Sequence, residues 1–266
     1  MSSRPVEIHV RGHALWIRLN RPAESNAISP ALLQGIDEAL EVAEADSEVR
    51  SVVIAANGEI FCAGADLKFI NSLLDSNDDA RRTPLSDFLR RAGDTLNRLE
   101  TFPKPVVGAV QGLAIAGGLE ILLCCDVVIA ARSARLGDGH ANFGLIPGAG
   151  GSIRLARRIG QARAKLLMFT GLSYPAADFV GTDLVHELVD DGQLEAAVDR
   201  LTDVIAGRSP LGLRRMKELA NSGVDLELSD GLELELRHSA EHEHSADFHE
   251  GITAFNQRRR PTFIGR

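Results

Sequence analysis

The chain has 266 residues, of which 44% are hydrophobic, so it can bury a sizeable core as one large domain or as a domain with a helical appendage. Its 29 Lys and Arg residues against 37 Asp and Glu residues give a formal charge of -8, which argues against nucleic acid or an anionic membrane as partner. The three cysteines include no CxxC pair, so neither a disulfide framework nor a zinc site is indicated.

The N-terminal region begins with two strand patterns, Val6 to Val10 and Leu15 to Leu19, and the turn Arg11-Gly12-His13 between them predicts a hairpin. No apolar segment with a cleavage site precedes them, so we expect a cytoplasmic protein. Pro30 then starts a predicted helix with an apolar face and an acidic face. The acidic face comprises Asp37, Glu38, Glu41 and Glu44.

The middle of the chain alternates between strand and helix patterns, which predicts an α/β or mixed sheet with helices outside it. We expect strands at Val52 to Ile54 and Val106 to Val110, a helix at Leu85 to Leu99, and a polar loop at Leu74 to Pro84. After Val189 the pattern changes to helices with no strand between them. These helices are Leu194 to Ile205, Leu211 to Ala220, Leu226 to Glu243 and Phe248 to Asn256.

The apolar run from Val106 to Ala131 raises the question of a membrane span, but it contains Glu120, Asp126 and four glycines. A carboxylate at the bilayer centre costs about 2.5 to 3.5 kcal/mol even on lenient insertion scales. We therefore interpret the run as strand, loop, helix and strand in a soluble core.

Two segments with small residues are candidates for binding a substrate oxygen. Phe61-Cys62-Ala63-Gly64-Ala65-Asp66 lies where a strand gives way to a helix, and Gln111 to Glu120 repeats this arrangement. Amides at a helix start are free donors, and two that converge on one oxygen form an oxyanion hole. Each segment taken alone is better explained as a tight turn.

The chain resembles the crotonase (enoyl-CoA hydratase/isomerase) superfamily, nearly end to end and with motif order and spacing preserved. The motifs that carry the resemblance are Leu19-Asn20-Arg21-Pro22 with Asn26-Ala27, Phe61 to Leu67, Lys104 to Gly112 with Gly117-Gly118-Leu119-Glu120, Ile146 to Gly151, and the ending Gly251 to Arg259 followed by Pro261.

The resemblance implies an α/β spiral of repeated ββα units, with a spiral core in residues 1–200 and a C-terminal helical trimerisation region in residues 201–266. It further implies an acyl-CoA thioester substrate, no cofactor other than the coenzyme A of that thioester, and a homotrimer or dimer of trimers. By motif position, the amides of Ala65 and Gly117 form the oxyanion hole. The residues expected to bind substrate or coenzyme A are Ala63, Asp66, Lys68 and Gly118.

Two side chains are candidates for proton transfer. Glu120 aligns with the first of the two glutamates that hydratases use, and its alternative role is structural, accepting bonds from loop amides. His140 stands where typical hydratases carry the second glutamate, and Asp138 is a possible orienter of its ring. This departure puts the two-glutamate mechanism in doubt, and His140 is alternatively a residue that only shapes the pocket.

We expect a hydratase that adds water to a 2-enoyl-CoA through a stabilised thioester enolate. The alternatives are an enoyl-CoA isomerase, a carbon-carbon bond hydrolase of the same fold, and a non-catalytic CoA-binding protein. An RNA-binding role is disfavoured by the acidic first helix. His238 and His242 are four residues apart without an HExxH pattern, and we interpret them as part of a solvated helix face, with no metal expected.

Overall fold

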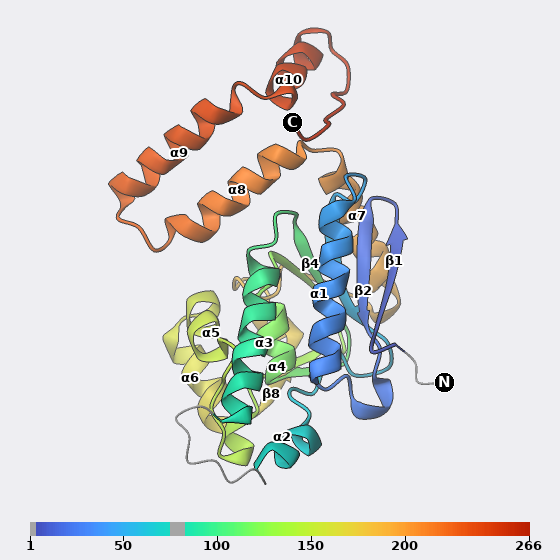
Figure 1. The fold of residues 1–266 in the computed structure, drawn as a ribbon, viewed down its shortest axis with the longest axis vertical. Coiled ribbons are helices and arrows are strands. Elements are labelled where there is room, and N and C mark those ends of the chain that lie inside the picture. The colour runs from blue at the N-terminus through green and yellow to red at the C-terminus, as the bar shows by residue number, and fades with distance from the viewer. Residues whose placement is uncertain (1–3, 75–82) are drawn as a thin grey trace.

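A computed structural model describes residues 4–74 and 83–266, and it contains two sheets with helices packed around them (Figure 1). The larger sheet has the order β1-β2-β3-β4-β6-β9. Its strands are β1 Val6–Arg11, β2 Ala14–Leu19, β3 Ser51–Ala56, β4 Val106–Val110, β6 Val127–Ala131 and β9 Glu187–Val189. β1 and β2 pair antiparallel as the predicted hairpin, and all the other pairs are parallel.

The smaller sheet has the order β5-β7-β8 and continues the turns of the larger one. Its strands are β5 Leu113–Ile115, β7 Arg135–Gly137 and β8 Ser173–Pro175. β4 passes directly into β5, and β6 into β7, so each turn of chain contributes one strand to each sheet. Cys62 extends the pattern to the preceding turn, because it forms a parallel bridge with Ala114.

Helices pack on both faces of the larger sheet, and the last three helices of the chain lie away from it. The helices are α1 Pro30–Ala45, α2 Leu67–Leu74, α3 Pro84–Glu100, α4 Gly117–Leu123, α5 Gly151–Ile159, α6 Gln161–Thr170, α7 Leu194–Ala206, α8 Pro210–Gly223, α9 Leu228–His242 and α10 Ala246–Asn256. The four short 3-10 turns are Pro22–Glu24, His140–Phe143, Ala176–Phe179 and Asp191–Gln193 among the described residues. This arrangement confirms the predicted mixed α/β class.

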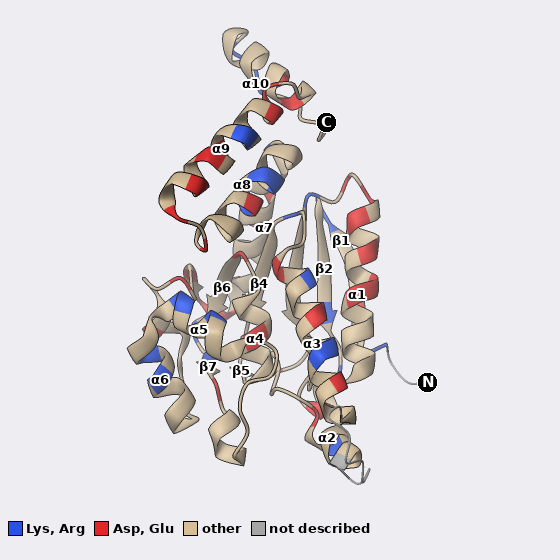
Figure 2. Cartoon of the chain, turned by 60° about the vertical axis from the view of Figure 1, so that its left-hand side comes forward, with Lys and Arg blue, Asp and Glu red and all other residues tan. Residues whose placement is uncertain are grey.

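Two apolar clusters divide the core between the two faces. Leu33 and Ile36 of α1 pack with Ile54 in the main cluster, whereas Trp16 packs with α7 residues such as Val198 in a second cluster. α1 begins at Pro30 because the Ser29 hydroxyl accepts the amide of Leu32, as an N-cap does. Of the predicted acidic face, Glu38, Glu41 and Glu44 are exposed on α1 (acidic positions red in Figure 2), but Asp37 is turned toward α3, where it accepts from Thr95 and pairs with Arg91.

The helices α8, α9 and α10 project from the body as a separate lobe (Figure 1). The predicted division at residue 200 falls inside α7, which packs on the sheet in both its halves, so the projecting helices begin at Pro210. The predicted polar loop falls largely on residues 75–82, which lie outside the described part of the chain. None of the described helices is long and apolar enough to cross a membrane.

Candidate functional site

Three successive turns of the chain bring the predicted site residues to the same edge of the smaller sheet. Ala65 follows the bridge of Cys62, Gly117 follows β5, and Asp138 follows β7. β5 and β7 run parallel with Ile115 opposite Gly137, so their carboxyl ends lie side by side. Ligand sites in sheets with parallel strands form at such ends.

The amides of Ala65 and Gly117 lie on adjoining segments. A Cβ built on Gly117 would be 3.4 Å from the Cα of Gly64 and 3.5 Å from its carbonyl carbon, to which the nitrogen of Ala65 is bonded. Neither amide donates a hydrogen bond to the described residues, whereas the amides of Ala63 and Asp66 donate to Ser25 and Ile28. Two unused donors therefore lie close together.

Small residues are required where these two segments meet. A Cβ on Gly118 would lie 2.3 Å from the carbonyl oxygen of Cys62, which is far inside contact distance. Gly64 has φ +95°, and its own Cβ would lie 2.9 Å from the Cβ of Ala116. Ala116 is held at φ 51° and ψ -117°, a sparsely populated conformation that places the start of α4 against the first segment.

Glu120 lies in α4 and is 5% exposed. Its Oε1 accepts hydrogen bonds from the amides of Ala149 at 3.0 Å and Gly151 at 2.9 Å. Gly151 is the first residue of α5, so the carboxylate also lies at the positive end of that helix dipole. Within the described chain both bonds end on Oε1, which leaves Oε2 available to a water or a substrate.

Asp138 and His140 form a pair next to Glu120. Asp138 is 2% exposed, and its Oδ1 lies 3.2 Å from both the amide and the Nδ1 of His140. Burial lowers the pKa of His140, but the hydrogen bond and charge of Asp138 and the charge of Glu120 outweigh it, so the pKa is raised overall. His140 is therefore a stronger base than a free histidine and keeps its proton up to a higher pH.

The residues predicted to bind coenzyme A occupy different environments. Ala63 and Lys68 are exposed, as a binding role requires, whereas Gly118 is buried against Cys62. The carboxylate of Asp66 accepts the amides of Lys68 and Phe69 and pairs with Arg21 at 3.1 Å. Burial raises the pKa of Asp66, but these bonds and the Arg21 charge lower it overall, so Asp66 remains ionised and holds the start of α2.

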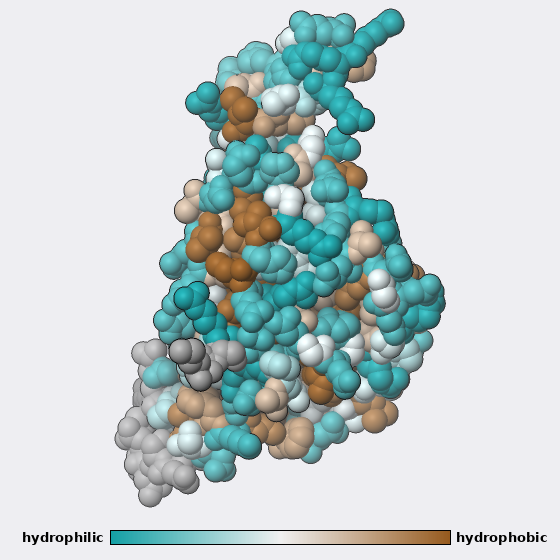
Figure 3. Space-filling view, turned by 90° about the vertical axis from the view of Figure 1, so that its right-hand side faces the viewer, coloured by the Kyte–Doolittle hydropathy of each residue, from teal (hydrophilic) through white to brown (hydrophobic). Residues whose placement is uncertain are grey.

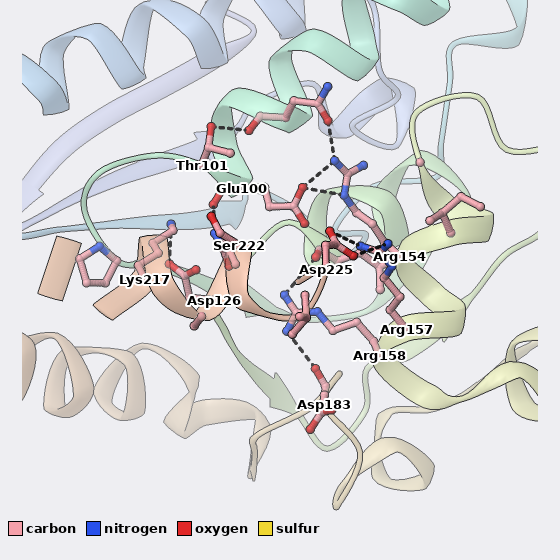
Figure 4. A pocket seen from close by; sticks show the side chains of 18 of the residues that line it. Glu100, Thr101, Asp126, Arg154, Arg157, Arg158, Asp183, Lys217, Ser222 and Asp225 are labelled. Carbon is pink, nitrogen blue, oxygen red and sulfur yellow. Dashed lines mark hydrogen bonds and ion pairs between the residues drawn. The ribbon is translucent and has the colours of Figure 1, made fainter. Parts of the chain in front are cut away.

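Sequence reasoning missed the partners of Glu120. The sequence analysis used Ile146 to Gly151 only as a motif of the family resemblance, although a glycine-rich run that opens a helix signals free amides. No local pattern indicated the open pocket of about 1150 Å³ that the same loop lines, between α3, α5 and α8 (Figure 4). That pocket is lined by Arg154, Glu100 and Lys217, and by neither Gly117 nor His140.

Metal ligation has no candidate in residues 4–74 and 83–266, because no group of three or more His, Cys, Asp or Glu side chains is arranged to hold an ion there. The three cysteines are buried thiols, and burial raises the pKa of Cys62 and Cys124 to about 12. They therefore stay protonated at neutral pH and offer no nucleophile.

The family model described as enoyl-CoA hydratase/isomerase matches residues 11–266. A 2,3-dehydroadipyl-CoA hydratase of Escherichia coli is 36% identical over 253 residues, which are 95% of each chain. The crystal structure of an enoyl-CoA hydratase from Bacillus anthracis superposes with a TM-score of 0.90 at 33% identity, covering 98% of this chain and all of that one. An enoyl-CoA hydratase structure from Polaromonas sp. JS666 gives a TM-score of 0.92 at 31% identity, with 97% and 99% covered.

Proposed function

The chain belongs to the enoyl-CoA hydratase/isomerase family, with the crotonase fold, and on that premise we propose that it hydrates a 2-enoyl-CoA to a 3-hydroxyacyl-CoA. The observation that carries this proposal is the arrangement of Glu120. Two amides fix one carboxylate oxygen of Glu120 and leave the other available. The free amide of Gly117 lies about one helical turn before Glu120, and the free amide of Ala65 lies in the segment that adjoins Gly117.

In the proposed reaction the thioester oxygen accepts hydrogen bonds from Ala65 and Gly117, which stabilise the enolate as it forms. Loss of one such donor typically costs about 2.7 to 4 kcal/mol of transition-state stabilisation. Glu120 Oε2 takes a proton from water as the water oxygen bonds to the β-carbon. The α-carbon then gains a proton, so that one water is added overall.

His140 is the proposed donor of the proton to the α-carbon. Its raised pKa favours the imidazolium form. Its Nδ1 is hydrogen-bonded to Asp138, which leaves Nε2 as the nitrogen that transfers the proton. The proton that Glu120 took from water restores His140 when the product leaves, which balances the cycle. The histidine thus replaces the second glutamate as the acid while the carboxylate remains the base.

The test is to offer the purified protein short, long, branched and aromatic 2-enoyl-CoAs and to follow enoyl-thioester absorbance and product mass together. Hydration adds the mass of one water, and the addition should label the product with oxygen-18 from labelled water. Glu120→Gln protein serves as the matched control for any spontaneous hydration. Absence of a water adduct with every thioester would reject the hydratase assignment.

Isomerase or carbon-carbon hydrolase chemistry is the second candidate, favoured by the single carboxylate paired with a histidine at this site. Isomerisation leaves the mass unchanged, so the same measurement separates it from hydration. A protein that binds CoA thioesters without converting any of them would instead fit the non-catalytic alternative.

We also propose that the projecting helices assemble a homotrimer or a dimer of trimers. α9 has no buried residue, and Leu228, Leu232 and Leu236 are 77%, 52% and 65% exposed at four-residue spacing on one face. Figure 3 shows apolar surface gathered in the upper half of the molecule. Light scattering should give a trimer or hexamer mass that Leu232→Glu with Leu236→Glu reduces to a monomer, whereas a monomeric wild type would reject the assembly.

A further inference from the structure

The side chain of Arg154 lies behind the loop whose amides hold Glu120. Arg154 belongs to α5, and its Nη1 donates to the carbonyl oxygen of Ala149 at 2.8 Å. The amide of the same Ala149 donates to Glu120 Oε1. A single buried residue therefore connects the guanidinium to the carboxylate, through its carbonyl on one side and its amide on the other.

The guanidinium is itself fixed on α3. Its Nε and Nη2 donate to Oε2 of Glu100 at 3.0 and 2.7 Å, and Nη2 also donates to Oδ1 of Asn97 at 2.6 Å (Figure 4). The Arg154 side chain is 15% exposed. Burial lowers its pKa, but the hydrogen bonds to Glu100 raise it overall, so the cation is permanent and its geometry is held by two side chains of another helix.

Gly150 leaves the space that this arrangement needs. It has φ +101°, and a Cβ there would lie 2.0 Å from Arg154 Nη1. The guanidinium therefore rests directly on the loop backbone, where a larger residue would push it away from Ala149. Glycine serves here both for the left-handed backbone and for this close approach.

In the described chain, the side chains of the other two arginines of this pocket donate their hydrogen bonds elsewhere than to the loop. Arg157 pairs with Asp225 at 2.9 Å, and both side chains are more than half exposed. Arg158 donates to the carbonyls of Leu123, Cys125 and Asp183. Among the described residues, Arg154 alone of these three donates a hydrogen bond from its side chain to the segment from Gly148 to Gly151.

We propose that Arg154 is a positioning residue for Glu120, acting through Ala149 and anchored by Glu100. The inference rests on the proposed role of Glu120 in proton transfer. Removing the guanidinium frees the carbonyl of Ala149, lets the loop shift, and changes the direction in which its amide presents the bond to Oε1. The substrate contacts at Ala65 and Gly117 are untouched, so the turnover step should suffer and substrate binding should not.

The test compares Arg154→Gln with Arg157→Gln, which removes an ion pair from the same helix without removing a hydrogen bond to the loop. With the enoyl-CoA that wild type converts fastest, Arg154→Gln should lower kcat by about 10- to 100-fold at nearly unchanged KM, as small misplacements of a reacting group do. Arg157→Gln should stay within about twofold of wild type. Arg154→Lys should recover part of the loss, because a Lys ammonium keeps the positive charge but lacks the planar set of N–H donors that binds Ala149 and Glu100 together.

A double-variant cycle separates positioning from general damage. In the Glu120→Gln background, Arg154→Gln should cause little further loss, because the group that it positions is already inactive. A full further loss in that background, or equal losses from Arg154→Gln and Arg157→Gln, would overturn the inference. If Arg154→Gln fails to fold, Glu100→Gln tests the same link from its anchor and should lower kcat in the same way.

The same measurements distinguish this inference from the proposed function. An unchanged kcat in Glu120→Gln would reject the role of the carboxylate itself. A strongly reduced kcat in Glu120→Gln, together with a wild-type kcat in Arg154→Gln and Glu100→Gln, would reject only the positioning role.

Discussion

Glu120 and His140 lie in one site, but different kinds of contact hold them. Glu120 is 5% exposed, and two backbone amides of a loop from another turn bind one of its oxygens. The ring of His140 has one hydrogen-bond partner in the described chain, Asp138, and His140 begins a short turn followed by exposed residues 141–146.

The difference shows which properties a substitution can change. The amides that hold Glu120 belong to the backbone, so no side-chain substitution at Ala149 or Gly151 removes them, although a shift of the loop can move them. The pKa of His140 is raised chiefly by one neighbouring carboxylate, so one substitution can alter it. We therefore expect Glu120 to set whether the protein turns over substrate and His140 to set the pH range.

The largest effect is expected for Glu120→Gln, which keeps the shape but removes the base. Turnover should fall by about 100-fold or more, the usual contribution of a general acid or base. Thermal unfolding should confirm that the variant folds, since Oε1 remains an acceptor for both amides. An unchanged rate would show that the carboxylate is structural and would remove the contrast with His140.

The next effect concerns the packing that places α4. Gly118→Ala puts a Cβ 2.3 Å from the backbone oxygen of Cys62, so the two segments must separate. We expect a loss of about 1 to 3 kcal/mol in the free energy of unfolding, together with lower turnover. Gly93→Ala is the matched control, because nothing lies within 4 Å of its added Cβ, and it should stabilise α3 by about 0.5 to 1 kcal/mol. Urea unfolding of both variants measures the difference.

Asp138→Asn should change the pH dependence more than the maximum rate. It removes the charge that raises the pKa of His140, so the loss of activity on the basic side should move to lower pH. At pH 8 the fall in kcat should be smaller than in Glu120→Gln. His140→Ala should remove this limb of the profile altogether, and a profile that is the same in all three proteins would make His140 a pocket residue.

Folding stability gives the same pair a second readout. Because the pKa of His140 is raised in the folded protein from its ordinary 6.5, folding favours the protonated form. The resulting stabilisation is fully present below about pH 6.5 and is lost as the pH rises through the folded pKa. The difference in melting temperature between wild type and Asp138→Asn should therefore be larger at pH 5.5 than at pH 8.

The smallest effect is expected at the outer anchor of the His140 turn. Asn142 Nδ2 donates to the carbonyl of Gly171 at 2.8 Å, and Asn142 is otherwise exposed. Asn142→Ala should cost about 0.5 to 1.5 kcal/mol in the free energy of unfolding, the net value of one hydrogen bond, and leave kcat unchanged. A large fall in kcat would mean that the position of His140 depends on more than Asp138.

Much of the fold could be predicted from local patterns. The hairpin from Val6 to Leu19, the helix that begins at Pro30, and the change to helices after Val189 all appear where the periodicity places them. Apolar spacing and turn residues act within about one element, so they are readable without knowing what packs against them. The segments around Ala65 and Gly117 could be singled out for the same reason, because free amides follow from a glycine-rich helix start.

The sequence by itself determined the order of the elements and the residue types that the site contains, including the histidine at position 140. Only the tertiary structure decided which groups meet. Glu120 is 29 and 31 residues from the amides that hold it, and Arg154 is 54 residues from Glu100. Such contacts arise from the stacking of successive turns, and their distances depend on the packing of Gly118, Gly150 and Gly151, which no local pattern encodes.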